Sequence, residues 1–261
     1  MSESRPARAA TRQPALFVSH GAPTLALDVV AGADFTRMAN DLPRPRAVLV
    51  LSAHWLDAPV TIGTTATREL MYDFGGFDPK LQEVSYRAPA TAELAREVQA
   101  LLPEAASAPA RPWDHGVWVP LVHMYPAADV PVLQLSMPVR WTPEQLFALG
   151  RSLASLRDQN VLVLGSGGAV HNLRAIDWAN GAPPAWAVEF EQWLCERLAA
   201  RDVDALLDFR SQAPAVRMAH PTDEHLLPLL VTLGAADADA ATFPIRGFEY
   251  GSLSRLAVRL G

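Results

Sequence analysis

The amino-acid sequence predicts an α/β fold: a single domain with a mostly parallel central sheet flanked by helices. Short apolar runs rich in β-branched residues alternate with longer segments of helical periodicity, a pattern typical of a parallel sheet covered on both faces. Three of these runs lead into a histidine. Because ligands of open α/β sheets bind at the carboxyl ends of the strands, we expect a metal site at that edge.

The composition favours one folded unit. Of the 261 residues, 50% are hydrophobic and 19% are charged, which is typical of a globular domain with a sizeable core. Residues 1–13 carry several arginines but no apolar segment of the kind a secretion signal has, so we expect a flexible tail there. The folded domain is then expected to cover residues 14–261.

Charge and cysteine content narrow the partners and the compartment. The net charge of −6 and the lack of any Lys/Arg cluster argue against nucleic-acid binding and favour small-molecule partners. No apolar run reaches the roughly 20 residues of a membrane span, so no membrane association is expected. Cys195 is the only cysteine, which excludes an intrachain disulfide and favours the reducing cytoplasm.

The predicted strands are apolar runs that do not alternate in polarity and are too short for helices, as in a buried parallel sheet. They cover Ala15–Val18, Ala47–Leu51, Val130–Leu135 and Val161–Leu164. A further strand is expected at Val60–Thr64, inside a long excursion over Asp57–Pro89 that is rich in Gly, Pro and aromatic residues. Long loops of this kind are often functional.

The predicted helices have apolar residues at helical spacing and recognisable start signals. They cover Thr91–Leu102, Pro143–Arg157, Pro184–Ala200 and Glu224–Leu233. Thr142 is positioned to cap the second of these, and Gly234 is expected to end the last.

Histidines stand at the ends of three predicted strands. His20, His54 and His171 follow three separate apolar runs in a chain with only 7 histidines. One such histidine is more often a packing or capping residue, but three at one sheet edge indicate a shared role. Neutral imidazole is a common ligand of zinc and iron, so we interpret the three as candidate metal ligands.

His225 is a fourth candidate. It follows Asp223 and Glu224 at the predicted start of a helix, where acidic residues commonly compensate the helix dipole. The same dipole disfavours a charged imidazole, so a neutral, metal-bound His225 suits this position.

The segment Pro112–Leu121 has the Pro and Gly content of a loop and holds His115 between Trp113 and Trp118. These aromatic residues either fill a gap in the core or form a pocket wall for a flat apolar substrate, with His115 as a hydrogen-bond partner. His123 and His220 have no comparable context, and we interpret both as structural or exposed.

Three other motifs do not predict a function. Gly165–Gly168 departs from the spacing of dinucleotide-binding loops, and Asp73–Gly75 lacks the other motifs of protein kinases. Ser19 and Ser166 do not lie in the G-x-S-x-G motif of serine hydrolases. The histidines therefore carry the chemical signal.

Taken in order, these segments resemble the DODA-type class III extradiol ring-cleavage dioxygenases, which are related to the catalytic subunit of protocatechuate 4,5-dioxygenase. The resemblance extends over about Leu16 to Ala236. The matching pieces are Ser19–Pro23, Ser52–Trp55, Tyr72–Phe77, Asp114–Leu121, Gly165–Gly167, His171–Leu173, His220–Pro221 and Glu224–Leu229.

The resemblance implies a metal centre. His20, His54 and His225 match its ligands, although Glu224 competes with His225 because the broader superfamily uses a carboxylate there. His171 matches a residue that is either a fourth ligand or the acid/base. One divalent metal per chain is implied, Fe(II) for activity, with Zn as a possible bound metal.

The resemblance also implies a substrate pocket. His115 matches a catalytic histidine that holds the substrate or the bound oxygen species. We expect an aromatic substrate-binding wall made of Trp113, Trp118, Phe74 and Phe77. A substrate with a carboxylate would need a basic partner, and Arg87, Arg111 and Arg174 are the candidates.

The activity implied is ring cleavage of a DOPA-like catechol by O2 to a semialdehyde, in a monomer or homodimer. Two alternatives stay open. Zinc and Fe(II) accept the same imidazoles, so a zinc-dependent hydrolase on the same scaffold is one. A non-catalytic metal-binding relative is the other.

Overall fold

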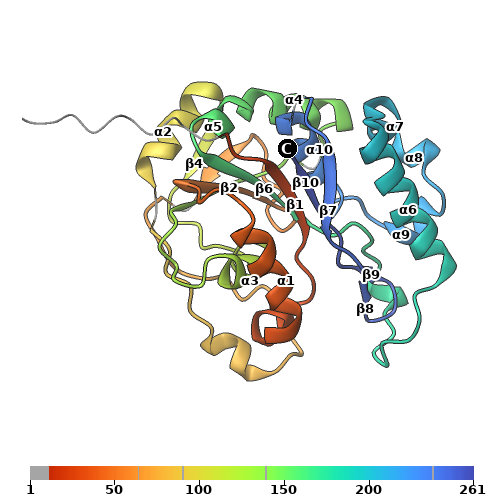
Figure 1. Ribbon diagram of the computed structural model, residues 1–261. Helices are drawn as coiled ribbons and strands as arrows, with labels where there is room; N and C mark the ends of the chain where they lie inside the picture. The colour runs from red at the N-terminus through yellow and green to blue at the C-terminus, as the bar shows by residue number, and fades with distance from the viewer. Residues whose placement is uncertain (1–11, 64, 90, 139, 237) are drawn as a thin grey trace, which may run out of the picture.

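The computed structural model describes residues 12–63, 65–89, 91–138, 140–236 and 238–261. Eight strands form one sheet in the order β4-β3-β5-β2-β6-β1-β10-β7 (Figure 1). The four strands β5, β2, β6 and β1 run parallel to one another. Strand β3 pairs antiparallel with β5, and β10 pairs antiparallel with β1 and β7. The sheet strands are β1 Ala15–Ser19, β2 Ala47–Ser52, β3 Thr61–Gly63, β4 Ala106–Ala108, β5 Val132–Leu135, β6 Val161–Gly167, β7 Ala241–Ile245 and β10 Ala257–Leu260.

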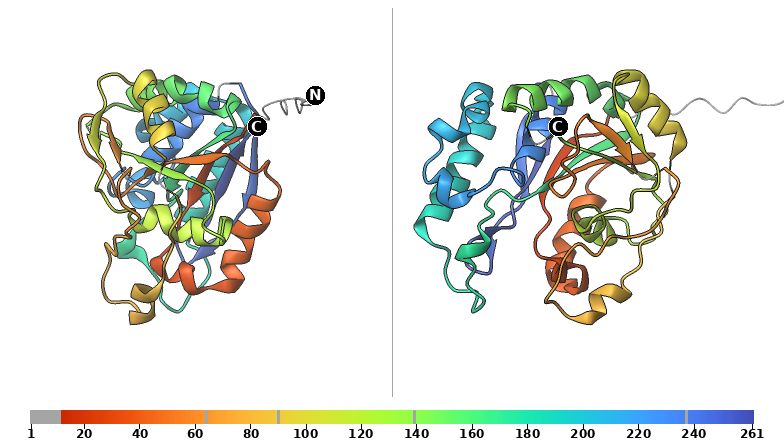
Figure 2. Two further views of the ribbon diagram at one scale, coloured as in Figure 1. Left: turned by 90° about the vertical axis from the view of Figure 1, so that its left-hand side faces the viewer. Right: turned by 180° about the vertical axis from the view of Figure 1, so that it is seen from behind.

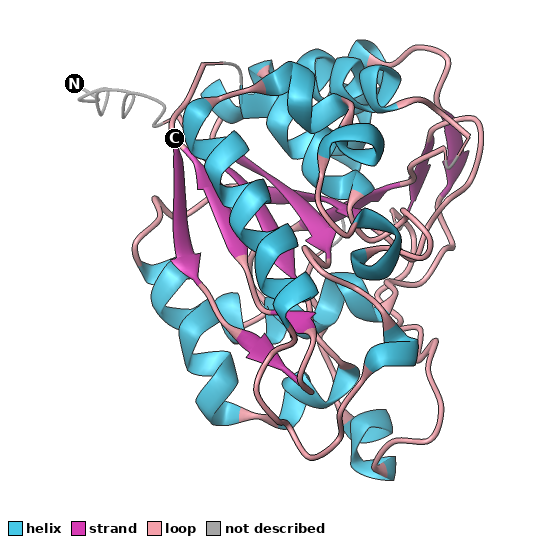
Figure 3. Ribbon diagram, turned by 90° about the vertical axis from the view of Figure 1, so that its right-hand side faces the viewer, coloured by secondary structure: helices cyan, strands magenta, loops and turns pink. Residues whose placement is uncertain are grey.

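Helices cover both faces of this sheet (Figures 2 and 3). In Figure 1, α1 and α3 lie below the sheet and α4 and α10 lie above it. The α-helices are α1 Val29–Asn40, α2 Ala92–Leu101, α3 His115–Met124, α4 Pro143–Leu153, α5 Ser155–Asp158, α6 Ala185–Ala200, α7 Val203–Leu207, α8 Phe209–Gln212, α9 Val216–Ala219 and α10 Leu227–Ala236. Three short 3-10 helices, η1 Pro23–Leu27, η2 Pro79–Glu83 and η3 Leu173–Ala175, and the two-stranded sheet of β8 Phe248–Glu249 and β9 Leu253–Ser254 complete the elements.

The central strands are buried on both faces, which is why they show no alternation of polarity. Leu16 and Val18 of β1 belong to the apolar cluster between the sheet and helices α1 and α3. Phe17 belongs to the cluster on the other face, between the sheet and helices α4 and α10. Successive strand residues point to opposite faces, so each strand supplies both layers of the core. The predicted single α/β domain with a mostly parallel sheet is confirmed.

Most of the segment interpreted as a loop, from His115 to Leu121, belongs to the helix α3, and that part of the prediction was wrong. Pro120 lies inside α3 and has no N–H to donate to the carbonyl of Gly116 one turn earlier. The Ser166 hydroxyl donates to that carbonyl at 2.5 Å instead. The helix can thus contain a proline because the side chain of Ser166, near the end of β6, supplies the hydrogen bond that the Gly116 carbonyl would otherwise lack.

The predicted bounds of the last helix were also wrong. Helix α10 begins at Leu227, so His225 lies in the turn before it, and the helix runs through Gly234 to Ala236. A Cβ atom on Gly234 would lie 2.0 Å from the carbonyl oxygen of Phe147 in α4. This glycine therefore permits close packing of two helices and is not a stop signal. The predicted helix Pro143–Arg157 is divided at Ala154 into α4 and α5.

Residues 1–11 of the expected tail lie outside the described residues. Gln13, which was also placed in that tail, is fully buried, and its side-chain amide donates to the carbonyl of Pro43 at 2.8 Å. Among the described residues, no helix is both long and apolar enough to cross a membrane.

Candidate active site

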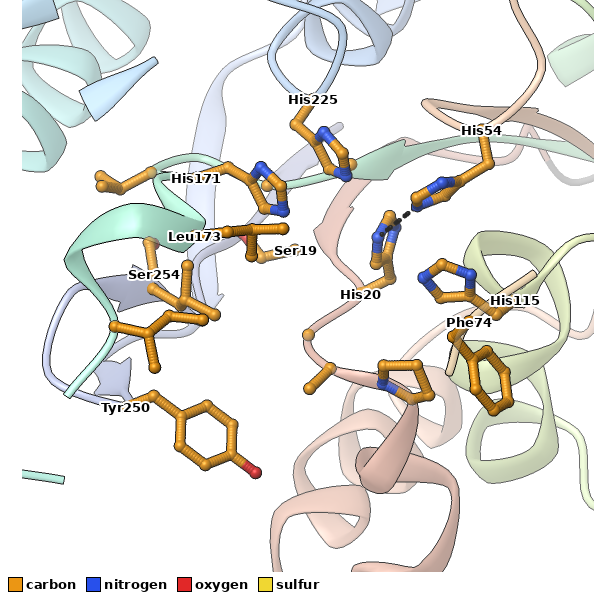
Figure 4. A pocket seen from close by; sticks show the side chains of 18 of the residues that line it. Ser19, His20, His54, Phe74, His115, His171, Leu173, His225, Tyr250 and Ser254 are labelled. Carbon is orange, nitrogen blue, oxygen red and sulfur yellow. Dashed lines mark hydrogen bonds between the residues drawn. The ribbon is translucent and has the colours of Figure 1, made fainter. Parts of the chain in front are cut away.

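Five histidines from distant parts of the chain meet at one edge of the sheet (Figure 4). His20, His54 and His171 follow β1, β2 and β6, which are neighbours in the sheet. His115 begins α3, and His225 lies in the turn before α10. The ring centroids of His20, His54 and His225 are 5.0 to 5.5 Å apart. Parallel strands thus bring their carboxyl-end residues together, as the sequence predicted.

These three imidazoles could hold a metal ion, since each offers a ligand atom within 4.8 Å of the others. Two further groups with the same spacing overlap this one. The first consists of His54, Asp73 and His115, and the second of His171, Glu224 and His225.

Hydrogen bonds fix which nitrogen of His20 carries the proton. The Ser166 hydroxyl gives its hydrogen to the Gly116 carbonyl, so the His20 Nδ1–H donates to Ser166 Oγ, 3.0 Å away. A neutral His20 then has its lone pair on Nε2, which lies 3.2 Å from Nε2 of His54. That lone pair is directed into the site, where it accepts from the Nε2–H of His54. A metal ion bound there would replace this shared proton.

His225 is held in the same way. Its Nδ1 lies 3.2 Å from Oε1 of Glu224, and because an ionised carboxylate only accepts, Nδ1–H is the donor. Its Nε2 is buried without a hydrogen-bond partner. Glu224 therefore orients the ring, and His225 presents the free lone pair.

Burial keeps the cluster neutral. Burial and the neighbouring histidines lower the pKa values of His20 and His225 well below the usual value, and burial and His115 lower that of His54 to about 3. Neutral imidazole is the form that binds metals. An unpartnered buried Nε2 together with neutral donors shows that this set fits a divalent metal.

His171 and His115 flank the group on opposite sides. The His171 ring stacks on His225 with centroids 3.5 Å apart, and burial lowers its pKa to about 4. The His115 ring lies 4.0 Å from that of His54, and its Nδ1 lies 2.9 Å from Oδ1 of Asp73. Burial raises the pKa of Asp73, but the hydrogen bonds and charge of His115 outweigh this and hold it below the usual value. Asp73 is thus an ionised acceptor for the Nδ1–H of His115.

A second layer of buried polar groups supports His54. The Asp114 carboxylate is fully buried, and it accepts from the Ser52 hydroxyl at 2.6 Å and from the Gln134 amide. Burial raises the pKa of Asp114. Ser52 in turn accepts from the backbone N–H of His54 at 3.2 Å. Asp73 and Asp114 were not predicted as site residues, although both lie beside aromatic or histidine residues in the motifs that carried the resemblance.

The histidines open into a cavity of about 320 Å³. Phe74 and Phe77, two of the residues predicted for the substrate-binding wall, line this cavity. Trp113 and Trp118, expected in the same wall, do not line it and are fully buried. Trp118 lies behind Phe74 with ring centroids 6.1 Å apart, because it belongs to the buried face of a helix and not to a loop.

The candidate basic residues do not reach this cavity. Arg111 stacks over the Trp55 ring at 4.5 Å, Arg174 lies in a neighbouring groove with Glu224, and Arg87 is exposed elsewhere. His123 and His220 have structural contacts. Their Nε2 atoms lie 2.8 and 2.9 Å from the carbonyl oxygens of Leu25 and Ala169, respectively.

Known proteins resemble this chain over nearly its whole length. Residues 15–261 match the family model described as the catalytic LigB subunit of aromatic ring-opening dioxygenase. A protein of Escherichia coli K12 named 4,5-DOPA dioxygenase extradiol is 38% identical and covers 96% of both chains. A Beta vulgaris protein of the same name is 36% identical over 84% of this chain and 85% of its own.

One solved structure has the same fold. It is the crystal structure of an uncharacterized protein of Escherichia coli K12, with a TM-score of 0.82 and 34% sequence identity. The match covers 96% of this chain and all of the other. The sequence comparisons and the structure comparison therefore both find similar proteins along nearly the whole chain.

Proposed function

The chain belongs to the LigB family of aromatic ring-opening dioxygenases, and on that premise we propose that it cleaves a catechol with O2 to a semialdehyde product. The observation that carries this proposal is the convergence of three neutral imidazole donors beside an aromatic-lined cavity. Several relatives carry the name 4,5-DOPA dioxygenase extradiol, so DOPA is one of the first catechols to test.

His20, His54 and His225 are the proposed ligands of one Fe(II) per chain, with zinc as a possible substitute. When bound, the metal would lower the pKa of the catechol hydroxyls and mediate electron transfer between substrate and O2. The donor set supports this assignment because the Nδ1 hydrogen bonds of His20 and His225 put the lone pair of each ring on Nε2, which in His225 is buried without a partner. Glu224 acts by orienting His225.

His171 is the proposed base. Burial lowers its pKa to about 4, so the ring is neutral near pH 7 and has a lone pair that can accept the proton of a catechol hydroxyl whose own pKa the metal would lower. His115 is the proposed proton carrier on the other side. Because Asp73 holds its Nδ1–H, its Nε2 can accept a proton and then donate it to oxygen while the carboxylate balances the charge. Phe74 and Phe77 would hold the aromatic ring between them and the histidines.

The remaining assignments are also proposals. The catalytic domain covers residues 14–261, which agrees with the extent of the family match. The proposed compartment is the cytoplasm, because the single cysteine of the sequence, Cys195, cannot form an intrachain disulfide. All five site histidines come from one chain, so both a monomer and a homodimer would have complete sites.

The experiment compares oxygen uptake and formation of the yellow ring-opened product by the Fe(II)-loaded wild type, His54→Ala and His123→Gln. The wild type is expected to consume catechol and O2 in equal amounts. His54→Ala should lose this activity, and His123→Gln should keep it because His123 bonds only to a backbone carbonyl outside the cavity. Uptake by His54→Ala at the wild-type rate would contradict the proposal.

A further inference from the structure

Tyr250 lines the cavity and has no role in the proposed mechanism. It lies in the turn between β8 and β9, and its ring packs against the exposed Trp178 at the mouth of the cavity, with ring centroids 5.2 Å apart. In Figure 4 it lies across the cavity from Phe74 and far from His54. Its hydroxyl oxygen lies 3.1 Å from the hydroxyl oxygen of Thr24 in η1. Tyr250 thus brings a hydroxyl group to the side of the cavity opposite His54.

The backbone of Tyr250 has a conformation that favours glycine. Its φ is 48°, and that of Gly251 after it is 75°. Among the described residues that line the cavity, Tyr250 is the only one other than glycine with a positive φ. Its carbonyl oxygen accepts from the backbone N–H groups of Asp177 and Ser252, both at 2.9 Å, and these bonds hold the conformation. A bulky residue held in a strained conformation at a cavity indicates a functional side chain.

The Tyr250 hydroxyl can donate a hydrogen bond to a ligand. A hydroxyl group has one hydrogen and two lone pairs, so Thr24 can donate to Tyr250 while Tyr250 donates elsewhere. The hydroxyl of Ser254, which also lines the cavity, already donates to Oε2 of Glu191 at 2.5 Å. Of these two hydroxyl groups, only that of Tyr250 has a hydrogen to offer.

A catechol bound at the histidines would direct its side chain toward the mouth of the cavity. Its two hydroxyl groups would face the proposed metal ligands, so a substituent on the far side of the ring would point away from them. We propose that Tyr250 is a specificity-determining residue, whose hydroxyl donates a hydrogen bond to a carboxylate at the end of that side chain. A hydrogen bond to a charged acceptor is stronger than one between neutral groups, so it can select such a substrate. This inference rests on the proposed function for the position of the ring.

Two ligands and one variant test the proposal. The ligands are 3-(3,4-dihydroxyphenyl)propanoate, whose side chain ends in a carboxylate, and 4-propylcatechol, which has no acceptor there. Tyr250→Phe removes the hydroxyl and keeps the ring that packs on Trp178. Calorimetry with the zinc-loaded chain measures both affinities without turnover.

We expect Tyr250→Phe to bind the propanoate about tenfold more weakly than the wild type does, and to bind the propyl compound equally well. The metal and every other charge are the same in both proteins, so the change in affinity for one ligand reports the hydroxyl alone. Equal affinity of the two proteins for the propanoate would overturn the proposal.

Two further variants separate recognition from a structural role. Thr24→Val removes the partner hydroxyl but leaves that of Tyr250, so it should weaken propanoate binding by no more than about threefold. Tyr125→Phe removes a buried hydroxyl outside the cavity lining and should change neither affinity. If Tyr250→Phe and Thr24→Val instead weakened both ligands to the same extent, the bond between the two hydroxyls would only support the mouth, and the proposal would be wrong.

Turnover distinguishes this proposal from the proposed function. In the Fe(II)-loaded chain, Tyr250→Phe should raise KM for the propanoate about tenfold with little change in kcat, because its hydroxyl binds the side chain and not the ring. If Tyr250→Phe lost affinity only for the propanoate but no catechol led to O2 uptake, the role of Tyr250 would stand and the dioxygenase function would fail. O2 uptake with the same KM for the propanoate in both proteins would keep the function and refute the role of Tyr250.

Discussion

The cavity has two parts that are built differently: a floor formed by the five histidines, and a rim at its mouth that includes Leu173, Trp178 and Tyr250. On the floor, His20 and His225 are buried, and the Nδ1 of each is tied to a side chain behind it. On the rim, Leu173 and Trp178 are largely exposed, and Trp178 is held by a ring contact with Tyr250. The geometry of the floor is thus fixed by strand ends and hydrogen bonds, whereas Leu173 and Trp178 come from η3 and the segment that follows it. The chemistry should depend on the floor and the choice of substrate on the rim.

The largest expected effect tests the floor at His225. His225→Gln removes a proposed ligand, so the chain should lose its metal and at least about 1000-fold in oxygen uptake. Glu224→Gln removes only the group that orients the ring, and metal affinity should fall about 10–100-fold. Metal content after dialysis and oxygen uptake are measured for both. Retention of metal by His225→Gln with loss from Glu224→Gln would make the carboxylate the ligand.

A smaller effect is expected at Asp73, which holds His115 and is not itself a proposed ligand. Asp73→Asn keeps the shape but removes the charge, so kcat should fall about 10–100-fold while the iron content stays unchanged. Asp78→Asn, on an exposed acid of the same segment, is the control. Loss of iron together with activity in Asp73→Asn would instead place Asp73 among the ligands.

Substitutions on the rim should change KM more than kcat. Trp178→Ala removes an exposed indole from the cavity mouth, so KM for an apolar catechol should rise roughly tenfold with little change in kcat. Val30→Ala, at an exposed apolar residue of α1 outside the cavity lining, should change neither constant. A change in kcat as large as that in KM for Trp178→Ala would remove the division between floor and rim.

The smallest effect on activity is expected at His220, which supports the floor from beneath. Burial lowers its pKa from 6.5 to about 4. The unfolded chain therefore binds more protons than the folded chain between these pH values. The stability that neutral His220 provides is complete above pH 6.5 and is lost as pH falls toward 4.

This acid sensitivity is measurable by urea unfolding of the metal-free chain at pH 7.5 and pH 5. His220→Gln cannot titrate, so its loss of stability between these values should be smaller than that of the wild type by about 2 kcal/mol. The other histidines contribute equally to both proteins. Identical losses would mean that His220 is not held neutral.

The sheet and the convergence of histidines were predictable because both follow from local sequence. A short β-branched run forms a buried strand, and parallel strands bring the residues after them to one edge. His20, His54 and His171 were found in this way. His225 was found from its place before an apolar helix, although the helix begins two residues later.

The features that were predicted wrongly or missed depend on contacts between residues far apart in the sequence. Helix α3 was hidden by Pro120, which is tolerated because Ser166 bonds to the freed carbonyl of Gly116. Because α3 was interpreted as a loop, the sequence could not show that Trp118 faces the protein core. Trp118 was therefore predicted in the substrate-binding wall. Asp73 belongs to a long excursion whose path is fixed by tertiary packing, so its contact with His115 left no pattern in the sequence.

The central claim is that the histidine floor holds an iron that couples catechol cleavage to O2. The most direct measurement is anaerobic loading of the metal-free chain with Fe(II) or Zn(II), followed by metal content and oxygen uptake with a catechol. We predict one metal per chain in both forms and O2 uptake matched to ring-opened product only with Fe(II). Metal binding without O2 uptake, or turnover of an ester or amide by the zinc form in the absence of O2, would contradict this account.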